Sequence, residues 1–362
     1  MPPAESVLSA AALRALLHWY RRRRRDLPWR VTGDPYRIWV SEILLQQTQV
    51  ETVRPYYERF LRRFPTVESL AAAPLDAVLK AWEGCGYYAR ARNLHKAAQQ
   101  VVAAGRLPRT AAEWRELPGI GAYTAAAIAS IGNGEAVAVI DGNVERVLAR
   151  VLRERRVIKT APVLKRLRRI ADSLISEAVA ARFAPGDFNQ AMMELGATIC
   201  RPRSADCARC PLNSECRARS ALADVTVLPR KAPRRVTPHY QIGAAVIRRN
   251  GKILITQRPL DGMLGGLWEF PGGKQHDGET LEQCVAREIR EELAIQIDVG
   301  AHIISVDHAY SHFSITLHCF DCRVRAGRIR KLGVAAFRWV TTAELDQYAF
   351  PKADRVVLAA LK

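Results

Sequence analysis

The sequence lacks any apolar run that approaches the roughly 18 residues needed by a membrane-spanning helix. It also lacks the order of an export signal, because the apolar stretch at 7–17 comes before its basic run instead of after it. No repeat or low-complexity segment stands out, apart from five arginines at 21–25. With 49% hydrophobic and 25% charged residues, the composition predicts a globular protein. Since no export signal is recognised, we expect a cytoplasmic protein without a membrane partner, and we expect it to be a monomer.

Acidic residues are scarce relative to basic ones, with 36 Asp and Glu against 55 Lys and Arg and a net charge of +19. Residues 239–362 contain 16 basic and 14 acidic residues, so 39 basic and 22 acidic residues remain for 1–238. Such an excess attracts a polyanion and favours salt-dependent binding of phosphates. The imbalance therefore predicts a nucleic acid partner for the first two thirds of the chain, although any single run could be a solvated basic face.

Cysteine is sparse outside one cluster. Four of the eight cysteines fall within 17 residues, and they are Cys200, Cys207, Cys210 and Cys216. In a reducing compartment such a cluster predicts a metal site rather than disulfides. Four thiolates can hold either zinc or an iron–sulfur cluster, and the chemistry of sulfur alone leaves both open.

The 362 residues are enough for about two domains. Apolar residues recur at helical spacing from about 11 to 199, with Pro and Gly in the gaps, which predicts successive helices. After residue 238, short β-branched runs at 242–247, 252–257 and 315–323 predict strands, and 280–294 predicts a helix. We expect a mainly α-helical domain at 1–216, a basic linker at 217–238 and an α+β domain at 239–362.

The segment Leu117-Pro-Gly-Ile-Gly-Ala-Tyr-Thr124 contains a glycine turn, and an apolar helix is predicted directly after it. Gly119 and Gly121 permit backbone conformations that other residues resist, and they let amide groups approach a phosphate closely. A plain helix–helix turn is the alternative. This turn resembles the helix–hairpin–helix motif of base-excision glycosylases, and Asp141 follows 17 residues later. The resemblance implies that Asp141 stabilises an oxocarbenium-like sugar, and the alternative is that it acts only as the N-cap of the next helix.

A second carboxylate, Glu42, lies within Trp39-Val-Ser-Glu-Ile-Leu-Leu-Gln-Gln-Thr-Gln49. A lone glutamate on a helix is usually solvated, but this one stands among apolar and amide side chains. Burial would raise its pKa and make it a proton donor. Two carboxylates in different environments, one an acid and the other a charge stabiliser, are the pattern expected for glycosidic bond cleavage.

Residues 26–216 resemble the MutY family of adenine DNA glycosylases through DLPWR, WVSEILLQQTQV, GCGYYARARNLHKAA, LPGIGAYTAAAIAS and IDGNVERVLARV. The resemblance implies a helix–hairpin–helix fold that acts on double-stranded DNA carrying A:8-oxoguanine or A:G mispairs. It implies Glu42 as the acid that protonates adenine and Asp141 as the group that stabilises the sugar cation, with Tyr123 and Asn143 in support. The resemblance also implies that substrate or DNA is bound by Arg30, Leu45, Gln47, Tyr87, Gly119, Gly121 and Gln190. The alternative is that these residues only pack between helices or lie on the surface.

The same resemblance bears on the cysteines and on strand cleavage. The spacing Cys200-x6-Cys207-x2-Cys210-x5-Cys216 is similar to the [4Fe–4S] loop shared by the endonuclease III and MutY groups. Endonuclease III has a lysine where this chain has Tyr123, and a tyrosine cannot form a Schiff base with the sugar. The resemblance therefore implies a monofunctional glycosylase with an iron–sulfur cluster, and an endonuclease III-like glycosylase/lyase is the rival within DNA repair.

The C-terminal region resembles the Nudix family, in a form similar to the MutT-like domain that reads 8-oxoguanine in the MutY family. Gly273, Glu279 and the run Arg287-Glu-Ile-Arg-Glu-Glu-Leu-Ala-Ile295 fit the Nudix box, except that Ala294 stands where the box has glycine. Glu288, Glu291 and Glu292 share one helical face, where they could bind Mg²⁺ for pyrophosphate cleavage or merely form salt bridges. An additional pyrophosphatase activity on oxidised nucleotides therefore stays open.

Within that domain, His308-Ala-Tyr-Ser-His312 resembles the Phe-Ser-His loop by which the family senses 8-oxoguanine. The resemblance implies that Tyr310, Ser311 and His312 contact the lesion, and a short turn between strands is the alternative. We thus expect excision of adenine opposite 8-oxoguanine or guanine in base excision repair. A nucleotide pyrophosphatase and a DNA-binding protein without catalysis are the competing hypotheses.

Overall fold

The computed structural model describes residues 7–233, 237–310 and 312–361. The chain divides into two compact units, one made of Met1–Glu68 with Lys96–Arg234 and the other of Ser69–His95 with Arg235–Lys362. No helix among the described residues has the length and apolar character needed to cross a bilayer.

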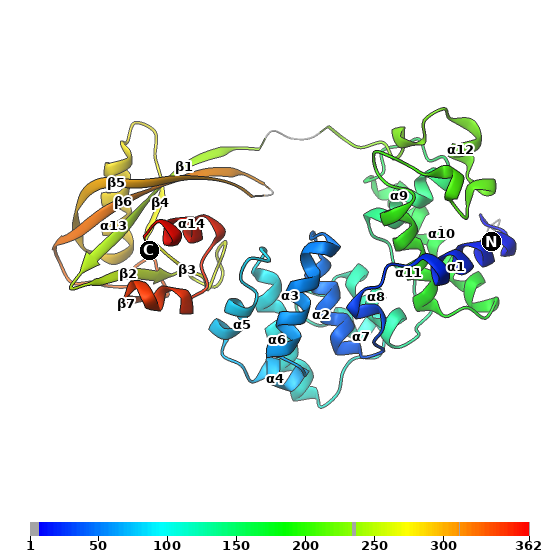
Figure 1. The fold of residues 1–362 in the computed structure, drawn as a ribbon, viewed down its shortest axis with the longest axis horizontal. Coiled ribbons are helices and arrows are strands. Elements are labelled where there is room, and N and C mark those ends of the chain that lie inside the picture. Colours follow the sequence, from blue (N-terminus) through cyan, green and yellow to red (C-terminus); the bar gives the residue numbers. More distant parts are fainter. Residues whose placement is uncertain (1–6, 234–236, 311, 362) are drawn as a thin grey trace. The chain divides into compact units, whose positions relative to one another are not determined.

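The first unit is built from helices, as expected from the periodicity (Figure 1). Its longer helices are α1 (Ala10–Arg23), α2 (Pro35–Leu45), α3 (Val50–Arg63), α8 (Ala122–Gly132), α9 (Gly142–Val151), α10 (Ala161–Ala180) and α11 (Pro185–Thr198). Shorter ones are η1 (Pro28–Arg30), α7 (Ala111–Arg115), η2 (Cys207–Arg209), η3 (Asn213–Glu215), α12 (Arg217–Ala221) and η4 (Val225–Val227). Helix α12 lies in the segment predicted as a linker. Helices α4 (Val67–Ala71) and α6 (Ala89–Ala104) each have residues in both units, and α5 (Leu75–Ala81) belongs to the second.

Local sequence signals fix several of these helix starts. Ser9 and Asp34 cap α1 and α2 with their side chains, and Pro35 occupies the first position of α2, where its missing N–H costs nothing. Thr110 and Glu113 form a reciprocal capping box at α7. One hydrophobic core of this unit joins α1, α9, α10 and α11, which pack through buried leucines such as Leu16, Leu148 and Leu195. Because α8 and α9 both pack against α11, the segments that precede α8 and α9 come together.

The second unit contains a seven-stranded sheet with the path β3-β2-β1-β6-β5, in which β4 also pairs with β1 and β7 with β2. The strands are β1 (His239–Arg249), β2 (Lys252–Gln257), β3 (Trp268–Glu269), β4 (Gly272–Lys274), β5 (Gln296–Ala309), β6 (Ser314–Ala326) and β7 (Ala336–Val340). Strands β1 and β6 run parallel, whereas the other pairs are antiparallel. The predicted α+β domain is confirmed.

One helix packs on each side of this sheet (Figure 1). Alternate residues of β1 face opposite sides, so Ala245 and Ile247 pack against α13 (Leu281–Leu293) while Ala244 and Val246 pack with α14 (Lys352–Ala360). The 3-10 helix η5 (Thr342–Gln347) precedes α14. Helix α13 matches the predicted helix at 280–294 closely, since Thr280 is its N-cap and Ala294 its C-cap.

Candidate active site

Glu42 lies near the middle of α2 and is 4% exposed. The Tyr123 hydroxyl donates a hydrogen bond to its Oε2 at 2.9 Å. Burial raises the pKa of Glu42 to about 7, and the Asp141 charge adds to the rise, whereas the Tyr123 hydrogen bond and Arg30 lower it. The side chain is therefore a buried acid that is protonated in a large fraction of molecules at neutral pH.

Tyr123 projects from the first turn of α8, directly after the glycine turn. Its pKa is raised well above the ordinary value by burial and by the Glu42 and Asp141 charges. The hydroxyl thus stays protonated and acts as a donor, and it lies 3.6 Å from the Met193 sulfur. This places the tyrosine between α2 and α11, where it fixes one oxygen of the Glu42 carboxyl.

Asp141 is the N-cap of α9, as the alternative interpretation expected. Its Oδ1 accepts from the Asn143 and Val144 backbone N–H groups at 2.9 and 2.7 Å, and its Oδ2 accepts from the Asn143 side-chain amide at 2.7 Å. The same carboxylate also lines the cavity that contains Glu42. Capping and participation in the site are therefore compatible, because the cap fixes the direction in which the carboxylate points.

A single cavity of about 170 Å³ brings together many of the predicted residues. Those that line it are Arg30, Glu42, Leu45, Tyr123, Asp141, Asn143 and Gln190. Gln47, Gly119 and Gly121 do not line this cavity, and Tyr87 belongs to the second unit.

Only one of the two glycines in the glycine turn, Gly119, has a backbone conformation that favours glycine. Gly119 has φ +77°, in the left-handed region that glycine tolerates best. Gly121 is the N-cap of α8 with an extended backbone, and a side chain added there would meet nothing within 4 Å. No side chain caps α8. The start of this helix is therefore open to a close approach of an anion.

Two residues predicted to contact DNA have unusual backbone conformations for non-glycine residues. Gln47 has φ +57° and Tyr87 has φ +49°. Residues other than glycine pay about 1–2 kcal/mol for the left-handed region. Such strain concentrates at functional sites. Tyr87 is 40% exposed, and the Arg90 guanidinium lies 5.3 Å from its ring centre.

The four clustered cysteines all line one cavity, together with Arg150 and apolar side chains. Arg150 is 1% exposed and donates to the Cys200 Sγ at 3.2 Å. Within the described part of the chain, no three His, Cys, Asp or Glu side chains are grouped to hold a single ion. The thiols thus surround a space without converging on one point.

A chain of hydrogen bonds joins this loop to Asp141. Arg146 donates from Nε to the Cys200 carbonyl at 2.8 Å and from a terminal nitrogen to the Asn143 Oδ1 at 2.8 Å. Asn143 in turn donates to Asp141. The cysteine loop therefore helps to orient the amide that holds the catalytic candidate.

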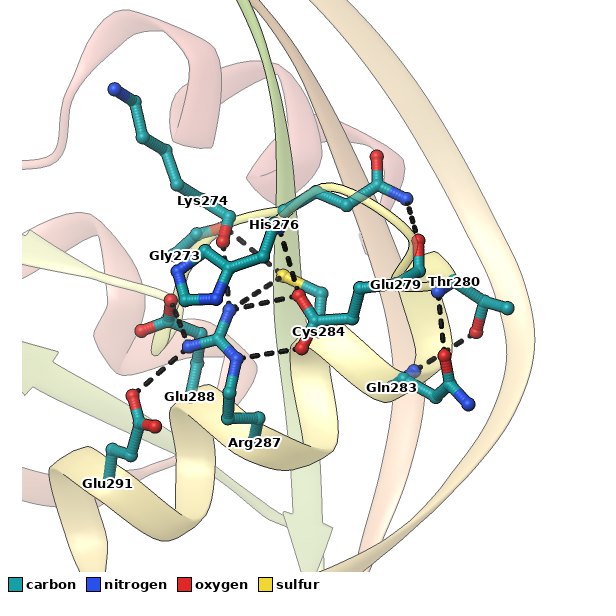
Figure 2. A network of polar contacts seen from close by, with 11 residues as sticks. Gly273, Lys274, His276, Glu279, Thr280, Gln283, Cys284, Arg287, Glu288 and Glu291 are labelled. Atoms are coloured by element: carbon teal, nitrogen blue, oxygen red, sulfur yellow. Dashed lines mark hydrogen bonds and ion pairs between the residues drawn. The ribbon is translucent and has the colours of Figure 1, made fainter.

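The Nudix-like segment of the second unit is organised by Arg287 (Figure 2). Its guanidinium donates to Glu279 at 2.7 Å, to Glu288 at 2.8 Å and to Glu291 at 3.0 Å. A Cβ at Gly273 would lie 2.3 Å from the Glu288 carboxyl carbon, so a side chain at this position would displace the Glu288 carboxylate. Ala294 takes φ +59°, which shows that alanine adopts the left-handed cap in place of glycine.

The three glutamates predicted as a Mg²⁺ site have different surroundings. Glu288 and Glu292 line a second cavity, whereas the Glu291 side chain is 57% exposed and does not line it. Burial raises the pKa of Glu292 to about 8, and the charges of Glu269 and Glu288 add to the rise. The described carboxylates therefore give no ready point at which three of them meet.

Two of the predicted lesion-sensing residues, Tyr310 and His312, lie between β5 and β6. The Tyr310 ring stacks on Phe313, with ring centres 4.8 Å apart, and His308 packs edge-on against it at 4.6 Å. His312 is exposed. Ser311 lies outside the described residues. Tyr310 thus belongs to an aromatic cluster that lines the second cavity.

Two stretches of the chain match known families. Residues 40–172 match the HhH-GPD superfamily of base excision DNA repair proteins, and residues 243–360 match the NUDIX domain. The human adenine DNA glycosylase is 35% identical over 95% of this chain and 72% of its own length. The adenine DNA glycosylase of Schizosaccharomyces pombe is 30% identical over 92% of this chain and 85% of its own length. The chain belongs to the adenine DNA glycosylase family.

A solved structure agrees with the fold of the first part of this adenine DNA glycosylase. A thermostable thymine-DNA glycosylase is 30% identical, with a TM-score of 0.50, and the match covers 57% of this chain and 94% of that one. The predicted family, the predicted helical and Nudix-like fold and the predicted enzyme class are all confirmed. The enzyme is accordingly a hydrolase of N-glycosidic bonds that acts in base excision repair.

Sequence reasoning missed Glu194, a charged residue that lines the cavity of the adenine DNA glycosylase site. The Glu194 side chain is fully buried and accepts from Arg25 at 2.8 Å and Arg30 at 2.7 Å. Burial alone would raise its pKa, but the hydrogen bonds from these arginines outweigh burial and lower it to about 2. Glu194 stands within an apolar helical run, Met192-Met-Glu-Leu195. A glutamate is rarely buried unless it is paired, so this position could have indicated a buried ion pair.

Proposed function

We propose that this enzyme excises adenine mispaired with 8-oxoguanine, and more weakly with guanine, as a monofunctional glycosylase that leaves the strand uncut. The meeting of Glu42, Tyr123 and Asp141 in one cavity carries this proposal. The position of Tyr310 in the Nudix-like region supports the 8-oxoguanine preference through the family resemblance. The basic excess of residues 1–238 supports double-stranded DNA as the partner.

Glu42 would protonate adenine, which is a poor leaving group until it carries a proton. The Tyr123 hydroxyl occupies Oε2, so Oε1 is left to carry the proton toward N7 of a flipped base. The Asp141 carboxylate would lie near the sugar as positive charge develops there, and an opposite charge stabilises that transition state. Water then attacks C1′ to give free adenine and an abasic site.

Arg30, Leu45 and Gln190 would surround the adenine, since they line the same cavity. Gln47 and Tyr87 would contact the duplex near the mispair, and their left-handed backbones support this assignment. The turn at Gly119 and Gly121 would hold a phosphate. Because Tyr123 stands where a lyase has lysine, no Schiff base with the sugar can form there.

The four cysteines fit a [4Fe–4S] cluster better than zinc. Zinc would draw all four thiolates to about 2.3 Å from one point, whereas the thiols here line a cavity without such convergence. We infer that Cys200, Cys207, Cys210 and Cys216 hold the cluster. When bound, it would fix the loop that presents Arg201 and Arg209 to DNA phosphates.

The deciding experiment is single-turnover cleavage of duplexes with A opposite 8-oxoguanine, G or T, and of thymine glycol opposite A, each developed with and without alkali. We expect alkali-dependent breaks at adenine opposite 8-oxoguanine and, more slowly, opposite G. Breaks without alkali, or at thymine glycol, would instead identify a lyase of the endonuclease III type.

The variant Asp141→Asn separates catalysis from capping, because asparagine is as good an N-cap as aspartate. We expect excision to fall by about 10²- to 10³-fold, with duplex affinity retained. An unchanged rate would mean that Asp141 serves only as the cap of α9.

The pyrophosphatase alternative is tested separately. Ala294 keeps the loop of the Nudix box in its left-handed form, which favours the alternative, but the described carboxylates do not converge on one point. Phosphate release from 8-oxo-dGTP with Mg²⁺, and its loss in Glu292→Gln, would establish this additional activity.

A further inference from the structure

Residues 82–88, between α5 and α6, form a tight turn that carries Tyr87, and we name them the Tyr87 turn. Three of these residues have a left-handed backbone, with φ +91° at Gly84, +72° at Gly86 and +49° at Tyr87. Glycine adopts this region freely, whereas tyrosine does not. A non-glycine residue keeps such a conformation only where its surroundings enforce it. The contacts that hold this turn are therefore candidates for a role in the activity.

Some of these contacts lie within the turn and beside it. Trp82 is fully buried, and its indole N–H donates to the Gly86 carbonyl at 3.1 Å. The Arg90 guanidinium donates to the same carbonyl at 3.1 Å and lies 5.3 Å from the Tyr87 ring centre. These contacts define the shape of the turn. Other residues attach it to the rest of the second unit.

The attachment is made to residues 348–350, which lie between η5 and α14 and which we name the connector. Glu83 accepts from the Phe350 N–H through Oε1 at 3.1 Å and from the Lys80 ammonium through Oε2 at 2.7 Å. Lys80 also donates to the Tyr348 carbonyl at 3.0 Å. Hydrogen bonds that involve a charged group are stronger than neutral ones. The Glu83 carboxylate thus joins the Tyr87 turn to the connector.

The connector is in turn anchored in the sheet. The Phe350 side chain is fully buried, in the core cluster against which Tyr310 packs. The Ala349 carbonyl accepts from the Trp268 N–H of β3 at 2.9 Å. The backbone of the connector therefore bonds to the sheet and to the Tyr87 turn at successive residues. Through this short segment, Tyr87 and Tyr310 are tied to one hydrophobic core.

We propose that Glu83 is a positioning residue, which holds the Tyr87 turn on the connector and thereby sets how well the enzyme distinguishes 8-oxoguanine from other bases opposite adenine. Glu83 acts through Tyr87, whose ring would meet the duplex, and Lys80 completes the attachment from α5. The inference rests on the proposed function, because it requires that Tyr87 contacts DNA near the mispair and that 8-oxoguanine is preferred.

Hydrogen exchange of the full-length protein without DNA tests the attachment. Glu83→Ala removes the carboxylate and should raise the exchange rates of amides in the Tyr87 turn about tenfold, because a detached turn opens locally. Glu83→Gln keeps an oxygen for the Phe350 N–H and should lie between wild type and Glu83→Ala. Glu282→Ala removes an exposed glutamate from α13 of the same unit and should leave the turn unchanged. Unchanged exchange in Glu83→Ala would overturn the proposal.

Duplex binding tests the effect on discrimination. In Glu83→Ala, we expect the ratio of the Kd for the A:T duplex to the Kd for the A:8-oxoguanine duplex to fall about fivefold. A merely structural role would weaken both complexes in parallel, so an unchanged ratio would overturn the proposal. Lys80→Met removes the donor to Glu83 and to the Tyr348 carbonyl but keeps an aliphatic side chain, and it should lower the ratio in the same direction.

A double-mutant cycle with Tyr87→Ala tests whether Glu83 acts through the tyrosine. If it does, Glu83→Ala changes the ratio by less than about twofold once Tyr87 has been removed. Independent, additive effects would overturn the positioning role. A wild type that fails to excise adenine in the single-turnover assay would refute the proposed function. A wild type that prefers 8-oxoguanine, with an unchanged ratio in Glu83→Ala, would refute only this inference, so the two failures are distinguishable.

Discussion

Glu42 can donate a proton only in its acid form, and burial keeps that form populated near neutral pH. Its pKa is raised to about 7, mainly by burial, so the acid form is lost as pH rises through 7. We predict that the single-turnover excision rate at saturating enzyme falls about tenfold for each pH unit above this value. The measurement is a pH profile on the A:8-oxoguanine duplex, and a flat profile between about pH 6 and 9 would contradict the assignment.

The matching substitution is Glu42→Gln, which retains the shape of the side chain but cannot supply a proton. General acid catalysis contributes about 10²- to 10⁴-fold, and a loss of this size is expected without a loss of duplex affinity. Glu58→Gln on α3 makes the same change at an exposed site of the same unit and should retain full activity.

The hydroxyl of Tyr123 provides a finer test, because its hydrogen bond lowers the pKa of Glu42 while burial raises it. Tyr123→Phe removes this hydrogen bond together with the hydroxyl's contact with the Met193 sulfur, which carries no charge. We predict that the decline of the excision rate shifts to higher pH, since the acid form of Glu42 persists longer. A shift to lower pH would show that the hydroxyl stabilises the acid form instead. A variant that merely disturbs packing would lower the rate without moving the profile.

At the level of single residues, the sequence could predict which side chains belong to the site but not which of them contact each other. Glu42, Tyr123 and Asp141 belong to recognisable motifs, and the structure brings them together in one cavity. The hydrogen bond from Tyr123 to Glu42 spans 81 residues, and no local pattern specifies such a contact. Glu194 and its ion pairs with Arg25 and Arg30 were missed for the same reason, because burial and ion pairing depend on the tertiary packing of α11 against the N-terminal segment.

Among the elements, α9 and α11 approach one another so closely that one glycine becomes essential. A Cβ at Gly196 would lie 2.6 Å from the Asn143 Cβ and 3.0 Å from its Cα and backbone oxygen. We predict that Gly196→Ala displaces the start of α9, and with it Asp141, at a cost of about 1–3 kcal/mol in stability. Thermal unfolding and single-turnover excision should both report the change.

Gly142→Ala is the matched control for this prediction. It makes the same substitution in the first turn of α9, next to Asp141, but the added Cβ meets nothing within 4 Å. It should leave the excision rate and the unfolding midpoint nearly unchanged. Loss of activity in both variants to the same degree would show that glycine is needed beside Asp141 for another reason, and the packing explanation would fail.

Elements were more predictable from sequence than contacts were. The expected strand at 252–257 coincides with β2, and the expected helix at 280–294 includes α13 with both caps. These succeed because period and capping residues are local properties. The conformation of Ala294 could not be settled in this way, since only the surrounding loop decides whether alanine tolerates φ +59°.

On the scale of the whole molecule, the exposed positive charge that would bind DNA is distinct from the buried carboxyl groups that would carry out excision. The basic excess lies in residues 1–238, whereas 239–362 are nearly balanced. Affinity for DNA should therefore depend on many exposed cations, while adenine excision depends on Glu42 and Asp141 in the cavity. Salt screens exposed charges strongly and buried ones weakly. Binding and chemistry should consequently respond differently to ionic strength.

We predict that raising the salt concentration from about 50 to 200 mM weakens duplex affinity by at least about tenfold, because neutralised phosphates release counterions. The single-turnover rate at saturating enzyme should change by less than about twofold, since the pKa of Glu42 is set mainly by burial. Titrations of the A:8-oxoguanine and A:T duplexes at several salt concentrations would give the slopes. Salt-independent affinity would refute the electrostatic role of the basic region. A rate that falls in parallel with affinity would place the acid in contact with solvent, contrary to its burial.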